Sequence, residues 1–237
     1  MAISMLCPFS TFAQGVPILI PGNLDVTAFG TSAFGSSLGS VTVSSSGIPS
    51  EKGTFTVGAP SSNGGGGVRA TWAITRRIRL YAEWSYIAGS RNNVNTNWIL
   101  AGPPESTRQI TLNVDTSFND VIGGLEWLFP IVRNPKLIPY LQVGAGTIIP
   151  GGSVSGSNIG ATPGGTFSAA IQGARVVWSG GSGIRYYFTE RAGLCVEVDG
   201  LFGPGSAAGT ISGSPAVITH GSTHSGRFVY GFVYTFH

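Results

Sequence analysis

The chain has 237 residues, of which only 10 % are charged, and its net charge is +3. An average soluble protein is about 25 % charged, so an ordinary hydrated surface is not expected, and the scattered arginines argue against a nucleic acid partner. No window approaches the roughly 20 consecutive apolar residues of a transmembrane helix. A membrane role is therefore open only to a closed β-barrel, the other structure that satisfies every backbone group in lipid.

The N-terminal segment resembles the end of a secretory signal. Its apolar residues finish with Thr11-Phe12-Ala13, directly before Gln14. A small residue after an apolar run predicts cleavage there, so residues 1–13 are interpreted as a truncated signal peptide, with a disordered tail as the alternative. Residues 14–237 are then expected to form a single exported domain that passes through the periplasm.

Eight strand-like runs follow along the chain. We predict strands at 24–34, 66–74, 78–88, 109–129, 137–147, 167–188, 192–202 and 227–237. Long Gly/Ser-rich loops are expected at 35–65, 89–107, 151–165 and 203–221, and short turns after the second, fourth and sixth strands. Long connections at one end and tight turns at the other are typical of outer-membrane barrels. The predicted fold is all-β, an eight-stranded antiparallel up-and-down transmembrane β-barrel.

Alternate residues of a strand point to opposite faces, and one face of these strands is apolar. In the last strand all the aromatic residues share this face, and no charged residue falls on it within the cores of the strands after the first. Aromatic residues near strand ends suit the girdles at a membrane interface. The sequence therefore predicts a lipid-facing aromatic belt that consists of Trp72, Trp84, Trp127, Trp178, Tyr186, Phe188, Phe228, Tyr230, Phe232, Tyr234 and Phe236.

The opposite face carries charged residues among glycine and serine. The interior of an eight-stranded barrel is only wide enough for side chains to fill it. Several tryptophans would overfill that space, whereas arginines matched with carboxylates would fit. We therefore expect the charges to face the lumen; a soluble lipocalin-like barrel, with the reverse orientation, is the alternative. Phe29 lies on the polar side of the first strand, and the sequence offers no reason for it beyond filling space.

Six of the inward charges are expected at mid-barrel heights. Buried charges are tolerated only when they are paired and hydrogen-bonded. The sequence thus predicts a luminal ion-pair network that plugs the barrel, and a narrow polar path for small solutes is the alternative. The predicted network consists of Arg69, Glu83, Glu126, Arg185, Glu197 and Arg227.

Catalytic, cofactor and metal sites are not expected. His220 and His224, with neighbouring serines, are the only cluster comparable to the site of a lipid-modifying enzyme, and no carboxylate is close in sequence. Two histidines four residues apart without acidic or thiol partners make a poor metal site. Cys195 is interpreted as a buried apolar residue. The asparagines at 92, 93, 95 and 97, followed by Trp98, are interpreted as part of a solvated loop, and a loop that binds an extracellular ligand is the alternative.

Four segments carry a resemblance to a known family: Arg79-Leu-Tyr-Ala-Glu-Trp84, Gly183-Ile-Arg-Tyr-Tyr-Phe188, the run 193–202 and the run 226–236. In this order they resemble the small outer-membrane β-barrel family related to the OmpA transmembrane domain, over nearly the whole mature chain. The resemblance implies a Gram-negative-type outer membrane, contact with its lipid, and insertion by the barrel-insertion machinery, which reads a terminal aromatic residue. Here His237 follows Phe236. The expected function is non-enzymatic, structural or surface-interaction work, with a porin-like channel as the alternative.

Overall fold

The computed structural model of the chain describes residues 20–45, 52–58, 63–88, 91–100, 106–131, 133–157, 166–170, 175–204, 208–211, 214–219 and 222–236. The strands formed by these residues pair in antiparallel fashion. Within these ranges no helix is long and apolar enough to cross a membrane. The expected signal segment, residues 1–13, lies outside the described residues and stays a prediction.

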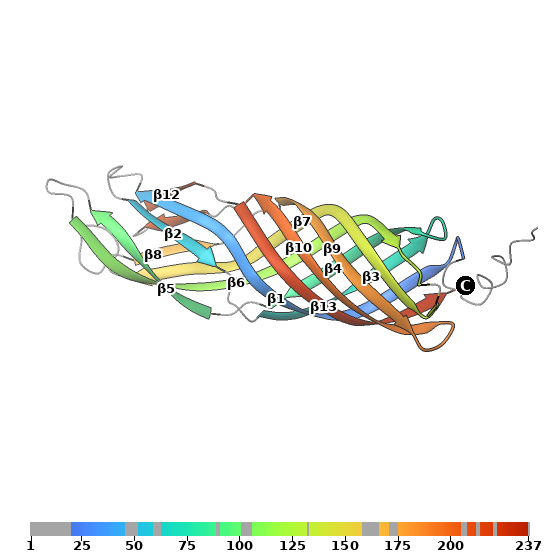
Figure 1. Ribbon diagram of the computed structural model, residues 1–237. Coiled ribbons are helices and arrows are strands. Elements are labelled where there is room, and N and C mark those ends of the chain that lie inside the picture. Colours follow the sequence, from blue (N-terminus) through green and yellow to red (C-terminus); the bar gives the residue numbers. More distant parts are fainter. Residues whose placement is uncertain are drawn as a thin grey trace, which may run out of the picture.

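Eight long strands close a barrel, which confirms the predicted fold class. Each strand pairs with the next, and the ring closes where the last strand pairs with the first, from Leu24 opposite Phe236 to Ser37 opposite His224. Figure 1 shows these strands wound obliquely around one axis. In ring order they are β1 (Leu24–Ser45), β3 (Asn63–Ala73), β4 (Ile78–Ile87), β6 (Ser106–Leu128), β7 (Leu137–Ser157), β9 (Arg175–Tyr187), β10 (Ala192–Pro204) and β13 (Ser222–Phe236).

A second ring of strands continues the first along the same axis (Figure 1). β1, β6 and β7 run on into it, and five further strands take the places of the other five. The ring closes between β1 and the last of these, with Thr42 opposite Thr219. We call this ring the extension tier and the first ring the barrel tier. The five further strands are β2 (Lys52–Gly58), β5 (Arg91–Leu100), β8 (Thr166–Ala170), β11 (Ala208–Ile211) and β12 (Ser214–Thr219).

The extension tier corrects the prediction of four long loops. The ranges 35–65, 89–107, 151–165 and 203–221 all contain strand residues. The asparagine-rich segment expected as a solvated loop, with ligand binding as the alternative, is β5, paired with β6 over its whole length. The strand predicted at 167–188 is two elements, β8 and β9. These segments satisfy their backbone groups by pairing with neighbouring strands, so their glycine, serine and asparagine content does not prevent strand formation.

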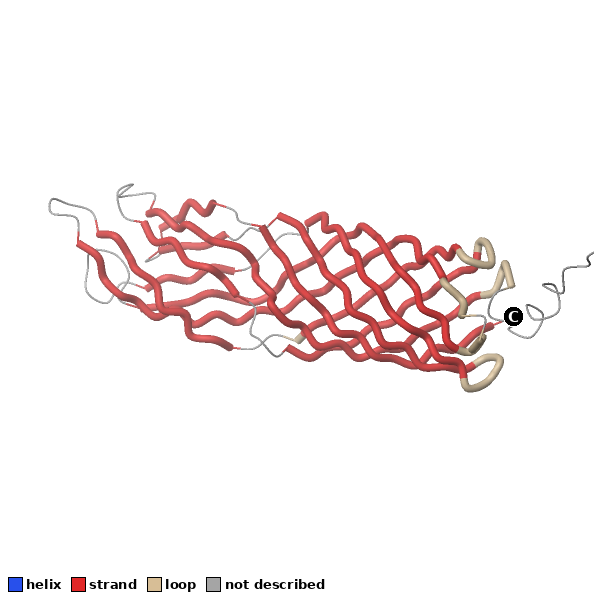
Figure 2. The backbone as a smooth tube through the Cα atoms, viewed as in Figure 1, coloured by secondary structure: helices blue, strands red, loops and turns tan. Residues whose placement is uncertain are grey.

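The connections opposite the extension tier are short, and side chains hold them. Thr75 Oγ1 accepts hydrogen bonds from the backbone nitrogens of Arg77 (3.2 Å) and Ile78 (2.9 Å). Thr189 Oγ1 accepts from Arg191 (3.2 Å) and Ala192 (2.9 Å) in the same pattern. The start of β1 and the end of β13 lie at this end as well, and Figure 2 shows the turns gathered there. We call it the short-turn end.

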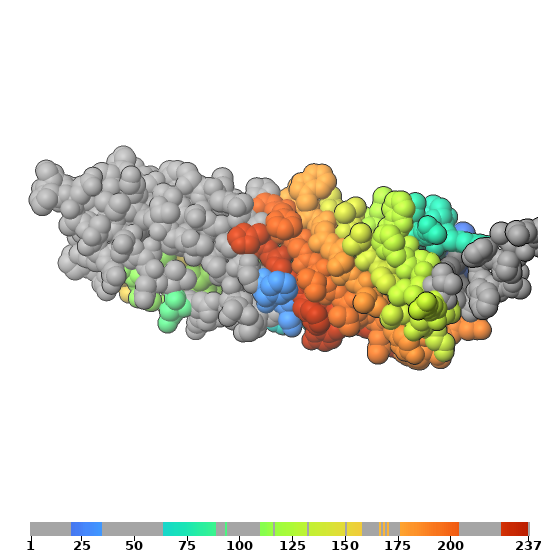
Figure 3. Space-filling model, in the orientation of Figure 1, coloured from blue at the N-terminus to red at the C-terminus, as the bar shows by residue number. Residues whose placement is uncertain are grey.

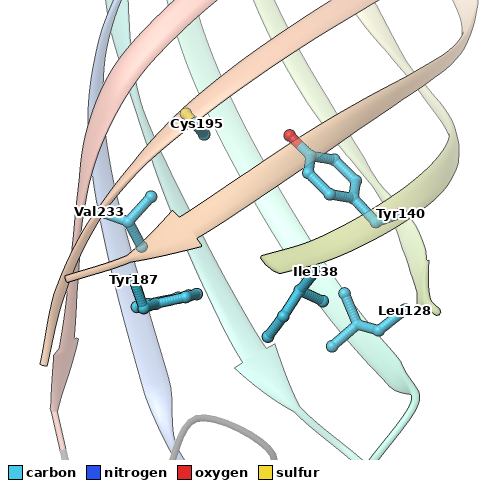
Figure 4. Packing of buried hydrophobic residues seen from close by; sticks show 6 residues of the cluster. All are labelled: Leu128, Ile138, Tyr140, Tyr187, Cys195 and Val233. Atoms are coloured by element: carbon cyan, nitrogen blue, oxygen red, sulfur yellow. The ribbon is translucent and has the colours of Figure 1, made fainter. Parts of the chain in front are cut away.

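The lumen of the barrel tier is packed in layers. Toward the short-turn end, buried Leu128, Ile138, Tyr140, Tyr187, Cys195 and Val233 form one cluster, seen in Figure 4. Toward the extension tier, β4, β6, β7, β9 and β10 each place a buried apolar side chain beyond their last inward charged or polar group; these are Ile87, Phe118, Ile148, Val177 and Leu201. The charged residues lie largely between these two layers. Cys195 is buried, as predicted.

Candidate functional site

The buried charges of the barrel tier form one continuous network. The predicted residues Arg69, Glu83, Glu126, Arg185, Glu197 and Arg227 come from six different strands, and all of them are at most 3 % exposed. β3 and β4 place Arg69 directly opposite Glu83, and β10 and β13 place Asp199 directly opposite Arg227. Strand register therefore brings several of the oppositely charged partners together.

Arg69 lies at the centre of the network. Its Nε donates to Glu83 Oε2 at 2.7 Å, and its two terminal nitrogens donate to the Glu197 carboxylate at 2.6 and 2.9 Å. Glu126 Oε1 is 3.6 Å from Arg69 Nη1. The guanidinium also lies 5.8 Å from the ring centroid of Phe29 and 5.2 Å from that of Tyr81. Phe29, which the sequence left without a role, thus gives the central cation an aromatic face.

Arg227 forms the part of the network nearest the extension tier. It binds Asp199 through Nε (2.8 Å) and Nη2 (2.6 Å), Asp120 through Nη1 (2.7 Å) and Glu83 through Nη2 (2.8 Å). Its Nη1 also donates to the Ser85 hydroxyl at 2.9 Å, and Ser85 donates to Asp120. One guanidinium therefore joins carboxylates from three other strands.

Arg185 and Arg79 form the part nearest the short-turn end. Arg185 Nη2 donates to both oxygens of Glu126, at 2.6 and 2.8 Å, and its guanidinium lies 4.6 Å from the ring centroid of Tyr140. Arg79 pairs with Asp25, and Tyr187 donates its hydroxyl to the same carboxylate at 3.1 Å. The network thus extends across the lumen to the first strand.

Eight further residues of the network were not predicted as members. Arg79, Asp120 and Asp199 share the inward parity of the predicted six, as does Asp25. Among uncharged residues, Tyr140 donates to Glu197 Oε2 at 2.6 Å and Gln142 donates to Glu197 Oε1; Ser85 and Tyr187 act as described above. The sequence signal that could have identified these eight residues is their position on the inward-facing side of the alternation along each strand.

The network contains more negative than positive groups. The described residues bury four guanidiniums and six carboxylates in the lumen. Every one of these carboxylates has an arginine nitrogen within 4.0 Å. Pairing of this kind is what makes buried charge tolerable.

The outer face of the barrel tier is apolar. Of the eleven residues predicted for the aromatic belt, ten are exposed, and Trp178 is the most exposed at 66 %. The eleventh, Tyr234, is half-buried, and the centroid of its ring lies 4.9 Å from that of Phe236. Aliphatic side chains such as Leu125, Leu141 and Val196 are exposed between them. Side chains of β9, β10 and β13 form a continuous band on the face in Figure 3, orange to red. Soluble monomers rarely expose so large an apolar surface.

The polarity of the two faces reverses in the extension tier, most clearly on β6. Within the barrel tier this strand buries Asp120 and Glu126 and exposes Val121 and Trp127. Within the extension tier the same strand buries Ile110, Leu112 and Val114 and exposes Thr111, Asn113 and Asp115. β7 repeats the pattern, with Val154 buried and Ser153 exposed. The outer surface therefore changes from apolar to polar between residues 121 and 115 of β6.

The histidine cluster does not form a site in the part of the chain that the structure describes. His224 is exposed on β13 whereas the adjacent Ser225 is buried, so the two side chains point to opposite faces. His220 lies outside the described residues. Among those that are described, no group of three or more histidine, cysteine or acidic residues is arranged to hold a metal ion.

The sequence matches no protein-family model, and no curated protein is detectably related to it. Among solved structures, the chain is similar to the outer membrane protein OprG from Pseudomonas aeruginosa, with 15 % identity over 92 % of this chain and 97 % of that one and a TM-score of 0.57. This likeness supports the fold.

Two further similar structures have lower TM-scores. Neisserial surface protein A has 14 % identity over 91 % of this chain and 99 % of that one, with a TM-score of 0.46. Ail, the attachment invasion locus protein of Yersinia pestis, has 10 % identity over 92 % of this chain and 100 % of that one, with a TM-score of 0.44. Because a fold does not determine function, function is argued from the residues of this chain. The narrower resemblance to the OmpA transmembrane domain stays a prediction.

Proposed function

We propose that this chain is a non-enzymatic barrel of a Gram-negative-type outer membrane, whose closed lumen makes it an anchor rather than a conduit. The barrel tier spans the lipid and holds the extension tier in water outside the cell, for structural or surface-interaction work. Outer-membrane lipid is then the partner of the aromatic belt, and the barrel-insertion machinery is a partner during biogenesis after export through the periplasm.

The reversal of polarity along β6 is the observation that carries this proposal. A surface of Val121, Leu125 and Trp127 is stable against hydrocarbon and unfavourable in water, and the exposed amide and carboxylate of Asn113 and Asp115 have the opposite preference. A single strand that changes from one surface to the other is suited to a molecule that stands in a bilayer with one end in water. A lipocalin-like barrel in water would need polar residues along the outside of both tiers.

The packing of the lumen supports the closed state. The Arg69 and Arg227 guanidiniums are each bound to carboxylates on several strands, and the apolar layers containing Ile87 and Leu128 lie on either side of the network. A solute would have to displace paired charges and an apolar layer to pass. Both displacements are costly because they strip partners from buried groups.

Single-channel recording in planar lipid bilayers tests the closed lumen. The folded chain, identified by its heat-dependent migration in gels, is expected to give no regular conductance steps. The Arg185→Ala variant removes the cation between Glu126 and the Tyr140 ring, and it is expected to open the lumen or to lower the unfolding temperature of the barrel. Regular steps from the unmodified chain would overturn the proposal of a plugged barrel.

A narrow channel is the second candidate, and a group of buried threonines favours it. The buried hydroxyls of Thr27, Thr31, Thr71 and Thr235 have no hydrogen-bond partner among the described residues. They lie on β1, β3 and β13, which are neighbours in the ring, and hydroxyls on this one side of the lumen could line a path for water. If regular conductance steps were observed and were reduced by Thr27→Val or Thr71→Val, this candidate would replace the plugged barrel.

A further inference from the structure

The short-turn end of the barrel is strongly basic. The β3–β4 connection carries Arg76 and Arg77, the β6–β7 connection carries Arg133 and Lys136, and the β9–β10 connection carries Arg191. Glu190 is the one acidic residue in these three connections, so they bear a net charge of +4 against +3 for the whole chain. All five basic side chains are exposed. We call them the basic ring.

The charged side chains of the basic ring are not used in the ion pairs of the described barrel residues. Among the described residues none of its members forms an ion pair, in contrast to the four arginines of the lumen. The turns are closed instead by the side chains of Thr75, Thr189 and Asn134, which accept hydrogen bonds from backbone nitrogens. The cations are therefore available to bind a partner in solution or in the membrane.

The positions of the cations relative to the aromatic belt indicate what that partner is. Each basic turn follows an exposed aromatic residue of the outer face: Trp72 before Arg76, Phe129 before Arg133, and Phe188 before Arg191. The three turns join successive hairpins, β3–β4, β6–β7 and β9–β10, which together make up six of the eight strands of the ring, and they lie at one end of the barrel (Figure 2). Aromatic residues near the strand ends of a membrane barrel lie at the level of the lipid headgroups, so the cations beyond them are placed near the phosphates.

We propose that the basic ring binds anionic phospholipid headgroups in the leaflet on the short-turn side, which rests on the membrane-spanning function proposed above. A guanidinium donates two parallel hydrogen bonds to a phosphate, and each cation near an anionic leaflet strengthens association by about fivefold. The distribution of the cations over three separate turns fits a shell of lipids around the barrel. If the partner were a single acidic protein segment, the cations would be expected to lie together on one side of the barrel.

Spin-labelled lipids measure this preference directly. The full chain is reconstituted in phosphatidylcholine bilayers, and the association constant of spin-labelled phosphatidylglycerol at the protein surface is compared with that of spin-labelled phosphatidylcholine. We expect a several-fold preference for the anionic lipid that weakens as salt is added. The triple variant Arg76→Gln, Arg77→Gln, Arg133→Gln should lose most of it.

A matched control removes the same amount of charge from the other tier. The control is the triple variant Lys52→Gln, Arg91→Gln, Arg108→Gln, whose positions are on β2, β5 and β6 of the extension tier. This variant should leave the preference for phosphatidylglycerol unchanged. Equal association of both lipids, or a preference that survives in the short-turn variant, would overturn the inference. So would binding of soluble polyglutamate by the basic ring without any lipid preference, which would assign the ring to an acidic protein.

The same spectra separate this inference from the proposed function. A chain that does not span the bilayer would show no motionally restricted lipid of either kind, which would refute the membrane barrel itself. Restricted lipid without a preference for phosphatidylglycerol would refute only the role of the basic ring.

Discussion

Arg227 and Asp199 form a two-point ion pair across neighbouring strands, with Nε 2.8 Å from Oδ1 and Nη2 2.6 Å from Oδ2. The register of β10 and β13 places the two residues directly opposite each other. The same guanidinium binds Asp120 and Glu83, so the closing strand of the barrel is tied to β4, β6 and β10 through one side chain.

Replacement of Arg227 by methionine should destabilise the barrel strongly. The change keeps much of the side-chain length but leaves Asp199, Asp120 and Glu83 without their shared cation. Loss of one partner from a buried ion pair costs about 3–5 kcal/mol. Urea unfolding in detergent, followed by gel migration, should show this loss, while Arg133→Met on an exposed turn should change the unfolding free energy by less than about 0.5 kcal/mol. Equal stability of the two variants would contradict the structural role of the network.

The Tyr140→Phe substitution tests a single hydrogen bond in the same network. The Tyr140 hydroxyl donates to Glu197 at 2.6 Å, and the ring lies against Arg185. Phenylalanine keeps the ring and removes the donor, so a loss of about 1.5–3 kcal/mol is expected for a bond to a charged acceptor. Tyr86→Phe, on the exposed outer face, serves as the matched control and should be nearly neutral. A neutral Tyr140→Phe would mean that this hydroxyl does not hold Glu197.

Gly183 gives the Tyr140 ring its space, so Gly183→Ala should also destabilise the barrel. A Cβ at Gly183 would lie 2.6 Å from Tyr140 Cζ and 2.8 Å from the Val196 carbonyl oxygen. Overpacking of this kind costs about 1–3 kcal/mol. On the outer face of β6, the nearest atom to a Cβ at Gly123 is the Tyr81 carbonyl oxygen at 3.7 Å, and Gly123→Ala should be tolerated. The comparison is read from the unfolding temperatures of the two variants in the same detergent.

The reversal of polarity between the tiers predicts that a new charge destabilises the barrel tier and is tolerated in the extension tier. Val196 is exposed on β10 between Leu194 and Val198, where an arginine would face hydrocarbon. Val196→Arg should lower the stability of the lipid-inserted barrel by about 2–4 kcal/mol. Asn113→Arg, on the outer face of the extension tier, should have almost no effect. Folding titrations into lipid vesicles measure both, and equal tolerance at the two positions would show that the tiers do not differ in their surroundings.

The barrel strands could be predicted from the sequence because their two faces differ sharply. β4 alternates buried and exposed residues along nearly its whole length, and this period of two is visible in the sequence as Arg79, Tyr81 and Glu83 between apolar neighbours. The extension tier could not be predicted in this way, since residues 35–65 and 203–221 are dominated by glycine, serine and small residues. Alternations such as Val41 and Val43 on β1 were present, but the signal from each segment of a barrel is weak.

The inward orientation of the charged residues could also be predicted from the alternation along each strand, but the size of the network that they form could not. Parity assigned Asp120 and Asp199 to the inward face, yet only the three-dimensional register shows that both reach Arg227. The contributions of Tyr140 and Gln142 depend on the register through β9, where Gly183 lies opposite both Tyr140 of β7 and Glu197 of β10. Phe29 is explained only by the position of the Arg69 guanidinium.

Fluorescence quenching of one tryptophan tests the orientation of the barrel most directly. In a variant that retains Trp84 and has the other four tryptophans replaced by phenylalanine, the chain is inserted into vesicles whose acyl chains carry bromine. Trp84 is exposed on the outer face of β4, so brominated lipid should quench its emission strongly and aqueous iodide should quench it little. Quenching by iodide with no effect of bromine would place this ring in water and would contradict the proposal that the apolar face of the barrel meets lipid.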